Sequence, residues 1–142
     1  MTFNALKNVA ASGLHYLPAS QRAIVESAAK RSRLNSYAVD ISHLSTISAI
    51  LEQFGRSLNF PIWYGANFDA LFDCLSDSSW QSGKDVLMYI DGMDRLRADD
   101  PEDFATLLEV LRSAIDARRP LKKAFWILID APARGVAPLP EA

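Results

Sequence analysis

The feature that most restricts the fold is a pair of five-residue segments, 86–90 and 125–129, in which every residue is apolar or aromatic. A strand with one face in water usually alternates apolar and polar residues, because successive side chains point to opposite faces. A segment that is apolar throughout is typical of a strand buried on both faces, as in a parallel sheet covered by helices. The two segments therefore predict an α/β protein with a buried sheet.

Segments with helical periodicity alternate with these strands. Residues 37–41 alternate across two faces and predict another strand, whereas apolar residues at every third or fourth position predict helices at about 45–57 and from 67 onward. A third helix is predicted from about 99 to 117, where acidic residues and Pro101 form a typical helix start. This order is typical of an α/β sandwich with a mainly parallel sheet.

The two ends of the chain extend beyond this pattern. Residues 1–12 have no clear period and predict a tail or a frayed helix, and residues 14–33 predict a short βα unit that could add a fourth strand. The Pro- and Ala-rich C-terminal segment predicts a trailing tail. We therefore expect one domain over 1–142, with an N-terminal extension at 1–33, a core at 36–130 and a tail at 131–142.

Charge is distributed unevenly along the chain. The net charge is −2, but residues 1–63 carry +3, residues 64–116 carry −8 and residues 117–142 carry +3. An acidic central segment favours a cationic partner and argues against nucleic acid, whose binding surfaces are basic.

The location of the protein is predicted from what the sequence lacks. No apolar segment approaches the roughly 18 residues of a membrane span, so we expect no membrane partner. The N-terminus has no signal-like pattern, and the single Cys74 cannot form an internal disulfide. We expect a buried, unreactive thiol and a cytoplasmic protein.

Three aspartates stand out within the acidic segment. Asp69, Asp73 and Asp77 recur at every fourth residue and are predicted to stack along one face of a helix. Asp is a poor helix former, and like charges at this spacing repel by a few tenths of a kcal/mol, so helix stability does not explain the pattern. The opposite face is predicted to carry the apolar residues Phe68, Leu71, Phe72 and Leu75.

Two aromatic residues, Trp63 and Tyr64, precede this helix. Gly65 suits a tight turn, and Asn67 can cap the helix N-terminus or brace the turn. Aromatic rings beside carboxylates predict a recognition surface for a basic partner.

The segment 60–75, with the sequence FPIWYGANFDALFDCL, resembles the signature of the barstar family of intracellular ribonuclease inhibitors. The resemblance covers roughly residues 36–130 in the order of the predicted elements. It implies a three-layer sandwich with three core strands, to which the N-terminal βα unit could add a fourth. It also implies a protein that is not an enzyme and that binds a basic ribonuclease.

The same resemblance implies roles for individual residues. Asp73 matches the main anchor of the family, a carboxylate that enters the phosphate-binding pocket of the nuclease, and Asp69 matches a second acidic contact. Trp63 and Phe72 match aromatic contact positions, and Asn67 matches a position in the contacting loop. The resemblance therefore implies an immunity protein that inhibits its nuclease by mimicking RNA phosphates. The residues expected to bind the nuclease are Trp63, Tyr64, Gly65, Asn67, Asp69, Phe72, Asp73 and Asp77.

Two departures from the family put the identity of the partner in doubt. A glutamate contact of the family falls on Ser113, and Glu109 or Asp116 are expected to lie elsewhere on that helix. The loop after the signature also differs, with Trp80 as its one large residue. These differences suggest altered specificity.

Two other functions stay open from the sequence. One is a non-inhibitory α/β interaction domain, in which the aspartates are merely solvated. The other is an acid/base hydrolase that uses Asp69 and Asp73. His15 and His43 lack partners at metal-ligand spacing, so we expect no metal and no cofactor. We expect a monomer.

Overall fold

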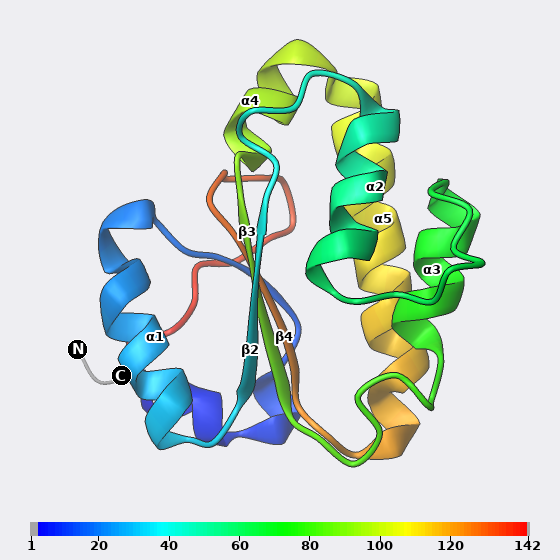
Figure 1. Cartoon of the computed structure of the whole chain (residues 1–142). Helices are drawn as coiled ribbons and strands as arrows, with labels where there is room; N and C mark the ends of the chain where they lie inside the picture. Colours follow the sequence, from blue (N-terminus) through cyan, green and yellow to red (C-terminus); the bar gives the residue numbers. More distant parts are fainter. Residues whose placement is uncertain (1–2, 142) are drawn as a thin grey trace.

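The computed structural model describes residues 3–141, and within them four strands form one wholly parallel sheet in the order β1-β4-β3-β2. The sheet lies between a layer with α1 and a layer with α2, α3 and α5 (Figure 1). The predicted α/β class and three-layer arrangement are confirmed, and the N-terminal βα unit supplies the fourth strand. In chain order, the elements are η1 (Asn4–Lys7), η2 (Val9–Ala11), β1 (Leu14–Tyr16), η3 (Ala19–Gln21), α1 (Arg22–Arg31), β2 (Asn35–Asp40), α2 (Ile47–Ser57), α3 (Phe68–Ser76), β3 (Val86–Asp91), α4 (Met93–Asp99), α5 (Pro101–Arg118), η4 (Arg119–Leu121) and β4 (Phe125–Ile129).

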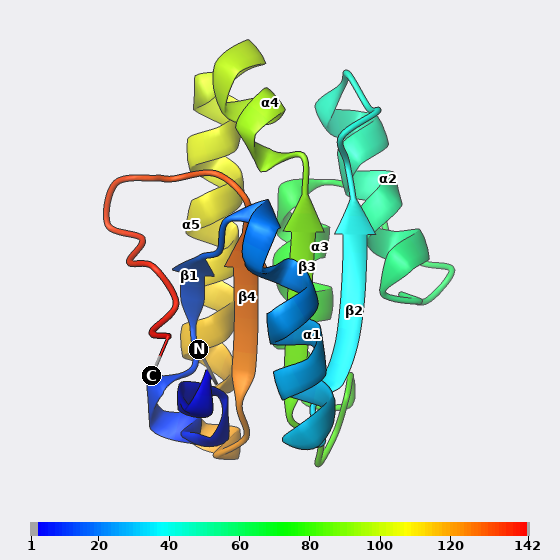
Figure 2. The ribbon, with the colours of Figure 1, turned by 90° about the vertical axis from the view of Figure 1, so that its left-hand side faces the viewer.

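Side chains of β3 and β4 alternate between two cores. Met88 and Ile127 belong to the core formed with α2, α3 and α5, whereas Leu87 and Trp126 belong to the core formed with α1 and η1. Figure 2 shows α1 in front of the sheet. Each of these two strands is covered on both faces, which explains why its sequence is apolar at every position.

The C-terminal segment differs from the predicted trailing tail. The amide of Tyr16 in β1 donates to the carbonyl of Ala137, and the amide of Leu139 donates to the carbonyl of Tyr16, both at 2.9 Å. Leu139 is buried in the α1-side core. The prediction of a trailing tail is therefore wrong, because residues 137–139 cover the free edge of β1 and satisfy backbone groups there. Residue 142 lies outside the described residues.

The N-terminal residues are also more ordered than predicted. Two short 3₁₀ helices, η1 and η2, replace the expected tail or frayed helix from residue 4 onward, and Phe3 and Leu6 are buried against the α1-side core. Residues 1–2 lie outside the described residues. Burial of these two side chains fixes a segment that has no periodicity of its own.

Helix α4 was not predicted. Its first amides, those of Gly92 and Met93, donate to the two carboxylate oxygens of Asp130 at 2.8 and 2.9 Å. Asp130 follows β4, the strand beside β3. The group that caps the start of α4 is therefore distant along the chain, and only the folded sheet brings it to the helix.

Candidate functional site: the acidic helix and its loop

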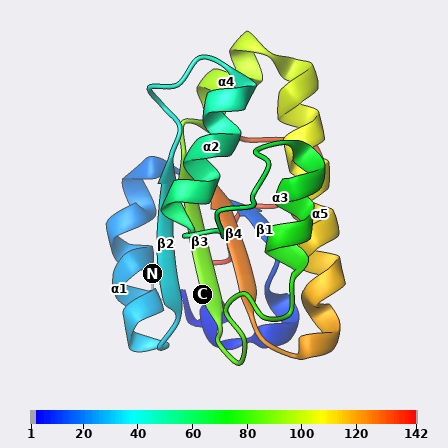
Figure 3. The same ribbon diagram turned by 45° about the vertical axis from the view of Figure 1, so that its right-hand side comes forward.

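Helix α3 begins as the sequence predicts. The side-chain oxygen of Asn67 accepts a hydrogen bond of 2.8 Å from the amide of Ala70, so Asn67 is the N-cap. On the face of α3 turned to the core, Leu71, Cys74 and Leu75 are buried. Figure 3 shows α3 beside α5 on the same side of the sheet. Packing against α5 leaves the other face of this short helix free.

That free face carries Asp69 and Asp73. Both residues are exposed, and within residues 3–141 no hydrogen bond or ion pair reaches either carboxylate. They lie one helical turn apart, and no Lys, Arg or His side chain of the described residues forms an ion pair with either of them. A partner would therefore meet two unpaired negative charges.

Asp77 does not continue this row of carboxylates. It follows the end of α3 in an extended conformation, with φ −63° and ψ 123°. Its carboxylate accepts hydrogen bonds of 2.8 Å from both the amide and the hydroxyl of Ser79, and these bonds lower the pKa of Asp77. The prediction of three stacked aspartates is wrong for Asp77, because the helix ends one residue earlier and the side chain shapes the following turn.

The two aromatic residues of the loop point in different directions. Trp63 is 63% exposed, and its neighbour Ile62 is fully exposed. Tyr64 is instead half-buried: its hydroxyl donates to the carbonyl of Leu51 in α2 at 2.8 Å, and its ring packs edge-on against Phe60. Burial raises the pKa of Tyr64, which keeps the hydroxyl protonated as a donor. Tyr64 therefore anchors the loop, while Trp63 and Ile62 are presented to solvent.

The turn into α3 uses a different residue from the one predicted. The left-handed conformation falls on Ala66, with φ 50°, and not on Gly65. A Cβ atom on Gly65 would stand 3.3 Å from the amide nitrogen of the Asn67 side chain. Gly65 thus leaves room for the capping side chain, whereas Ala66 makes the turn.

An open groove of about 610 Å³ runs between α3 and α5. From α3 it is lined by Phe68, Asp69, Phe72 and Asp73, and from α5 by Thr106, Glu109, Val110 and Ser113. Glu109 was expected to lie elsewhere on the helix than Ser113, but the structure places both along this groove. The spacing of four residues between them is the sequence signal that could have found Glu109. Asp116 instead pairs with Arg119 at 3.2 Å, outside the groove.

The thiol of Cys74 is buried behind this surface. Burial, together with the charges of Asp73 and Asp77, raises its pKa. A protonated, buried thiol is a poor nucleophile and a poor metal ligand. Among residues 3–141, no group of three or more His, Cys, Asp or Glu side chains is placed to hold a metal ion.

The fold and this surface define an α/β sandwich that presents an acidic helix next to an exposed aromatic loop. A family model described as Barstar (barnase inhibitor) matches residues 34–130, and the chain belongs to the barstar family. The description is that of an inhibitor and not of an enzyme. A comparison with curated proteins finds no match. In the part of the chain that the structure describes, no helix is both long enough and apolar enough to span a membrane.

Proposed function

We propose that the protein binds and inhibits a basic ribonuclease through the free face of α3 and the loop before it. One observation carries the proposal: Asp69 and Asp73 extend from the same exposed face, one turn apart and unpaired within residues 3–141. By resemblance to the family, the carboxylate of Asp73 enters the phosphate-binding pocket of the nuclease, and that of Asp69 makes a second contact.

The carboxylates act as substitutes for RNA phosphates. A ribonuclease active site holds Arg, Lys and His groups placed to donate charge-assisted hydrogen bonds to phosphate oxygens, and a carboxylate can accept the same bonds. Negative potential around α3 also speeds encounter with a cationic surface. Asp77, at the end of α3, adds to this potential.

Aromatic and positioning residues complete the surface. Trp63 and Phe72 supply apolar contact next to the carboxylates, as their match to family positions implies. Tyr64, Gly65 and Asn67 hold the loop and the start of α3 in place. A rigid surface loses little conformational entropy when it binds.

An acid/base hydrolase is a poorer fit to the same residues. Acid/base catalysis relies on groups in a desolvated site that shifts their pKa values. Asp69 and Asp73 are both exposed on a helix surface. We therefore propose a binding protein and not an enzyme, acting in the cytoplasm as an immunity protein.

The test is to titrate the purified protein into a panel of small basic ribonucleases and to measure RNA cleavage. We expect stoichiometric suppression with one member of the panel. Asp73→Ala should weaken inhibition by about tenfold to a hundredfold, since it removes a charge-assisted hydrogen bond. Glu102→Ala, which removes an exposed charge of α5 outside the groove, should leave inhibition unchanged. A complex that forms without suppressing cleavage would instead favour a non-inhibitory interaction domain.

A further inference from the structure

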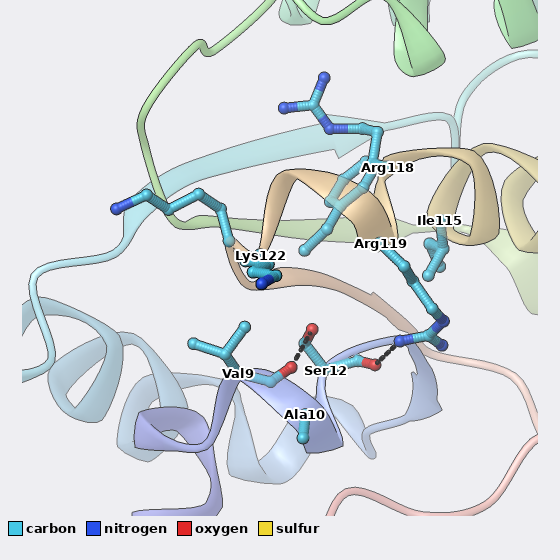
Figure 4. A pocket seen from close by; sticks show the side chains of 9 residues that line it. Val9, Ala10, Ser12, Ile115, Arg118, Arg119 and Lys122 are labelled. Carbon is cyan, nitrogen blue, oxygen red and sulfur yellow. Dashed lines mark hydrogen bonds between the residues drawn. The ribbon is translucent and has the colours of Figure 1, made fainter.

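A second concave site lies at the seam between the N-terminal segment and the core. This seam cavity, of about 490 Å³, has Val9 and Ser12 on one side and Ile115 on the other (Figure 4), and Phe125 also lines it. Its size is within the range of small-molecule sites. It shares no lining residue with the α3–α5 groove. Val9 and Ser12 also precede residue 34, where the family match begins, so the cavity depends on the extension of this chain.

The interior of the seam cavity offers few free polar groups. The hydroxyl of Ser12 donates to the carbonyl of Val9 at 2.7 Å, and the carbonyl of Ser12 accepts from Nη1 of Arg119 at 3.3 Å. The side chains of Val9, Ile115 and Phe125 are hydrocarbon. A nucleobase inside the cavity would leave donors and acceptors unpaired, whereas a hydrocarbon would not.

The rim of the seam cavity is cationic. Four of its lining residues are Arg or Lys, and none is acidic. The Arg118 guanidinium bonds to backbone carbonyls and is turned away from Val9 and Ser12 (Figure 4), and Arg119 is held by two acceptors. The side chains of Lys122 and Lys123 are exposed, and neither ammonium group makes a hydrogen bond or ion pair with any residue in 3–141. Their ammonium groups are the ones available to an anion.

We propose that the seam cavity binds an amphipathic organic anion, with a hydrocarbon body against Val9, Ile115 and Phe125 and a single anionic group at Lys122 and Lys123. Burial of the body supplies a favourable hydrophobic contribution, and the two lysines select the charge. A fatty acid and a single-chain lipid phosphate share this chemistry.

Binding is tested on the whole protein by ¹H–¹⁵N spectra during titration with decanoate, decyl phosphate, decanol and adenosine monophosphate. We expect saturable shifts of the amides at 9–12 and 115–125 with the two amphipathic anions, and weaker binding of decanol and of the nucleotide. The tighter of the two anions identifies the preferred headgroup. No nuclease is used, so the result is independent of the proposed inhibition.

Charge reversal provides the matched comparison. Lys122→Glu with Lys123→Glu should weaken binding of the anions by about tenfold, while Lys30→Glu with Lys84→Glu, at exposed lysines outside the cavity, should not. Val9→Asp, at a residue that is already 38% exposed, should give a similar loss of anion binding if the double reversal does not fold. Equal affinity in the Lys122/Lys123 variant, shifts that map elsewhere, or tighter binding of the nucleotide would overturn the proposal.

Discussion

The ring of Tyr64 approaches Gly55 so closely that a Cβ atom on residue 55 would stand 2.7 Å from ring carbon Cδ2. One turn earlier in α2, the carbonyl of Leu51 accepts the hydrogen bond of the same tyrosine. Tyr64 therefore packs against Gly55 and is hydrogen-bonded to Leu51. These two contacts hold Tyr64, and with it the loop that presents Trp63, in place on α2.

Gly55→Ala is therefore expected to destabilise the fold. Ala is the better helix former by about 1 kcal/mol, but the added methyl group must displace the Tyr64 ring, and such overpacking costs about 1–3 kcal/mol. Urea unfolding of the variant and the parent measures the net change in the free energy of unfolding. Ser48→Ala, at an exposed position of the same helix, should stabilise slightly or change little. A Gly55→Ala variant more stable than the parent would mean that Tyr64 is free to move.

Arg118 is expected to stabilise the fold through packing as well as hydrogen bonding. It is only 5% exposed, its guanidinium donates to the carbonyl of Asp77 at 2.8 Å, and it lies over the rings of Trp80 and Phe125. Burial lowers its pKa, so the charge itself is held at a cost. Arg118→Ala should destabilise the protein by about 2–4 kcal/mol, because it opens a cavity and leaves a carbonyl without its donor.

The variant Arg118→Met separates the contribution of side-chain packing from that of the guanidinium group. Met keeps most of the side-chain volume and buries no charge, so we expect less than half the loss of Arg118→Ala in urea unfolding. Arg56→Ala, at an exposed arginine of α2, should stay within about 0.5 kcal/mol of the parent. Equal losses for the Ala and Met variants would assign the effect to the guanidinium, through its hydrogen bonds and its contacts with the rings of Trp80 and Phe125, and not to side-chain volume.

Glu109 is predicted to contribute to nuclease binding if the proposed function holds. It lines the groove with Asp69 and Asp73 and can meet a cation of the partner from the α5 side. Glu109→Ala should weaken binding by about two- to fivefold, chiefly through slower association, and the effect should shrink at high salt. Stopped-flow association at two ionic strengths measures this, with Glu102→Ala as the control. A loss that is independent of salt would contradict an electrostatic role.

Stability should fall at alkaline pH because of two tyrosines. Burial raises the pKa of Tyr64, and burial with nearby Asp130 and Asp91 raises the pKa of Tyr89 to about 12. An unfolded tyrosine has a pKa of about 10 and releases its proton first, so these contributions are complete below pH 10 and are lost as pH rises towards 12. Urea unfolding at pH 8, 10 and 11 should show this decline, and Tyr89→Phe should flatten it. An unchanged slope in Tyr89→Phe would exclude Tyr89 as a cause.

Local patterns explain why much of the architecture could be predicted. The apolar segments at 86–90 and 125–129 are strands buried on both faces, and Asn67 caps α3 as its position predicts. Helix α4 escaped prediction because its capping carboxylate, Asp130, comes from the end of a neighbouring strand. The binding roles of the α3 surface stay predictions.

By itself, the sequence determined a buried parallel sheet between helices and an acidic helix beside aromatic residues. These follow from periodicity and capping, which act over a few residues. Only the tertiary structure decided that Trp63 faces solvent while Tyr64 is seated on Gly55, that Glu109 joins the groove of α3, and that the C-terminal segment covers β1. Such relationships depend on which elements pack together, and packing joins residues whose distance along the chain carries no periodic signal.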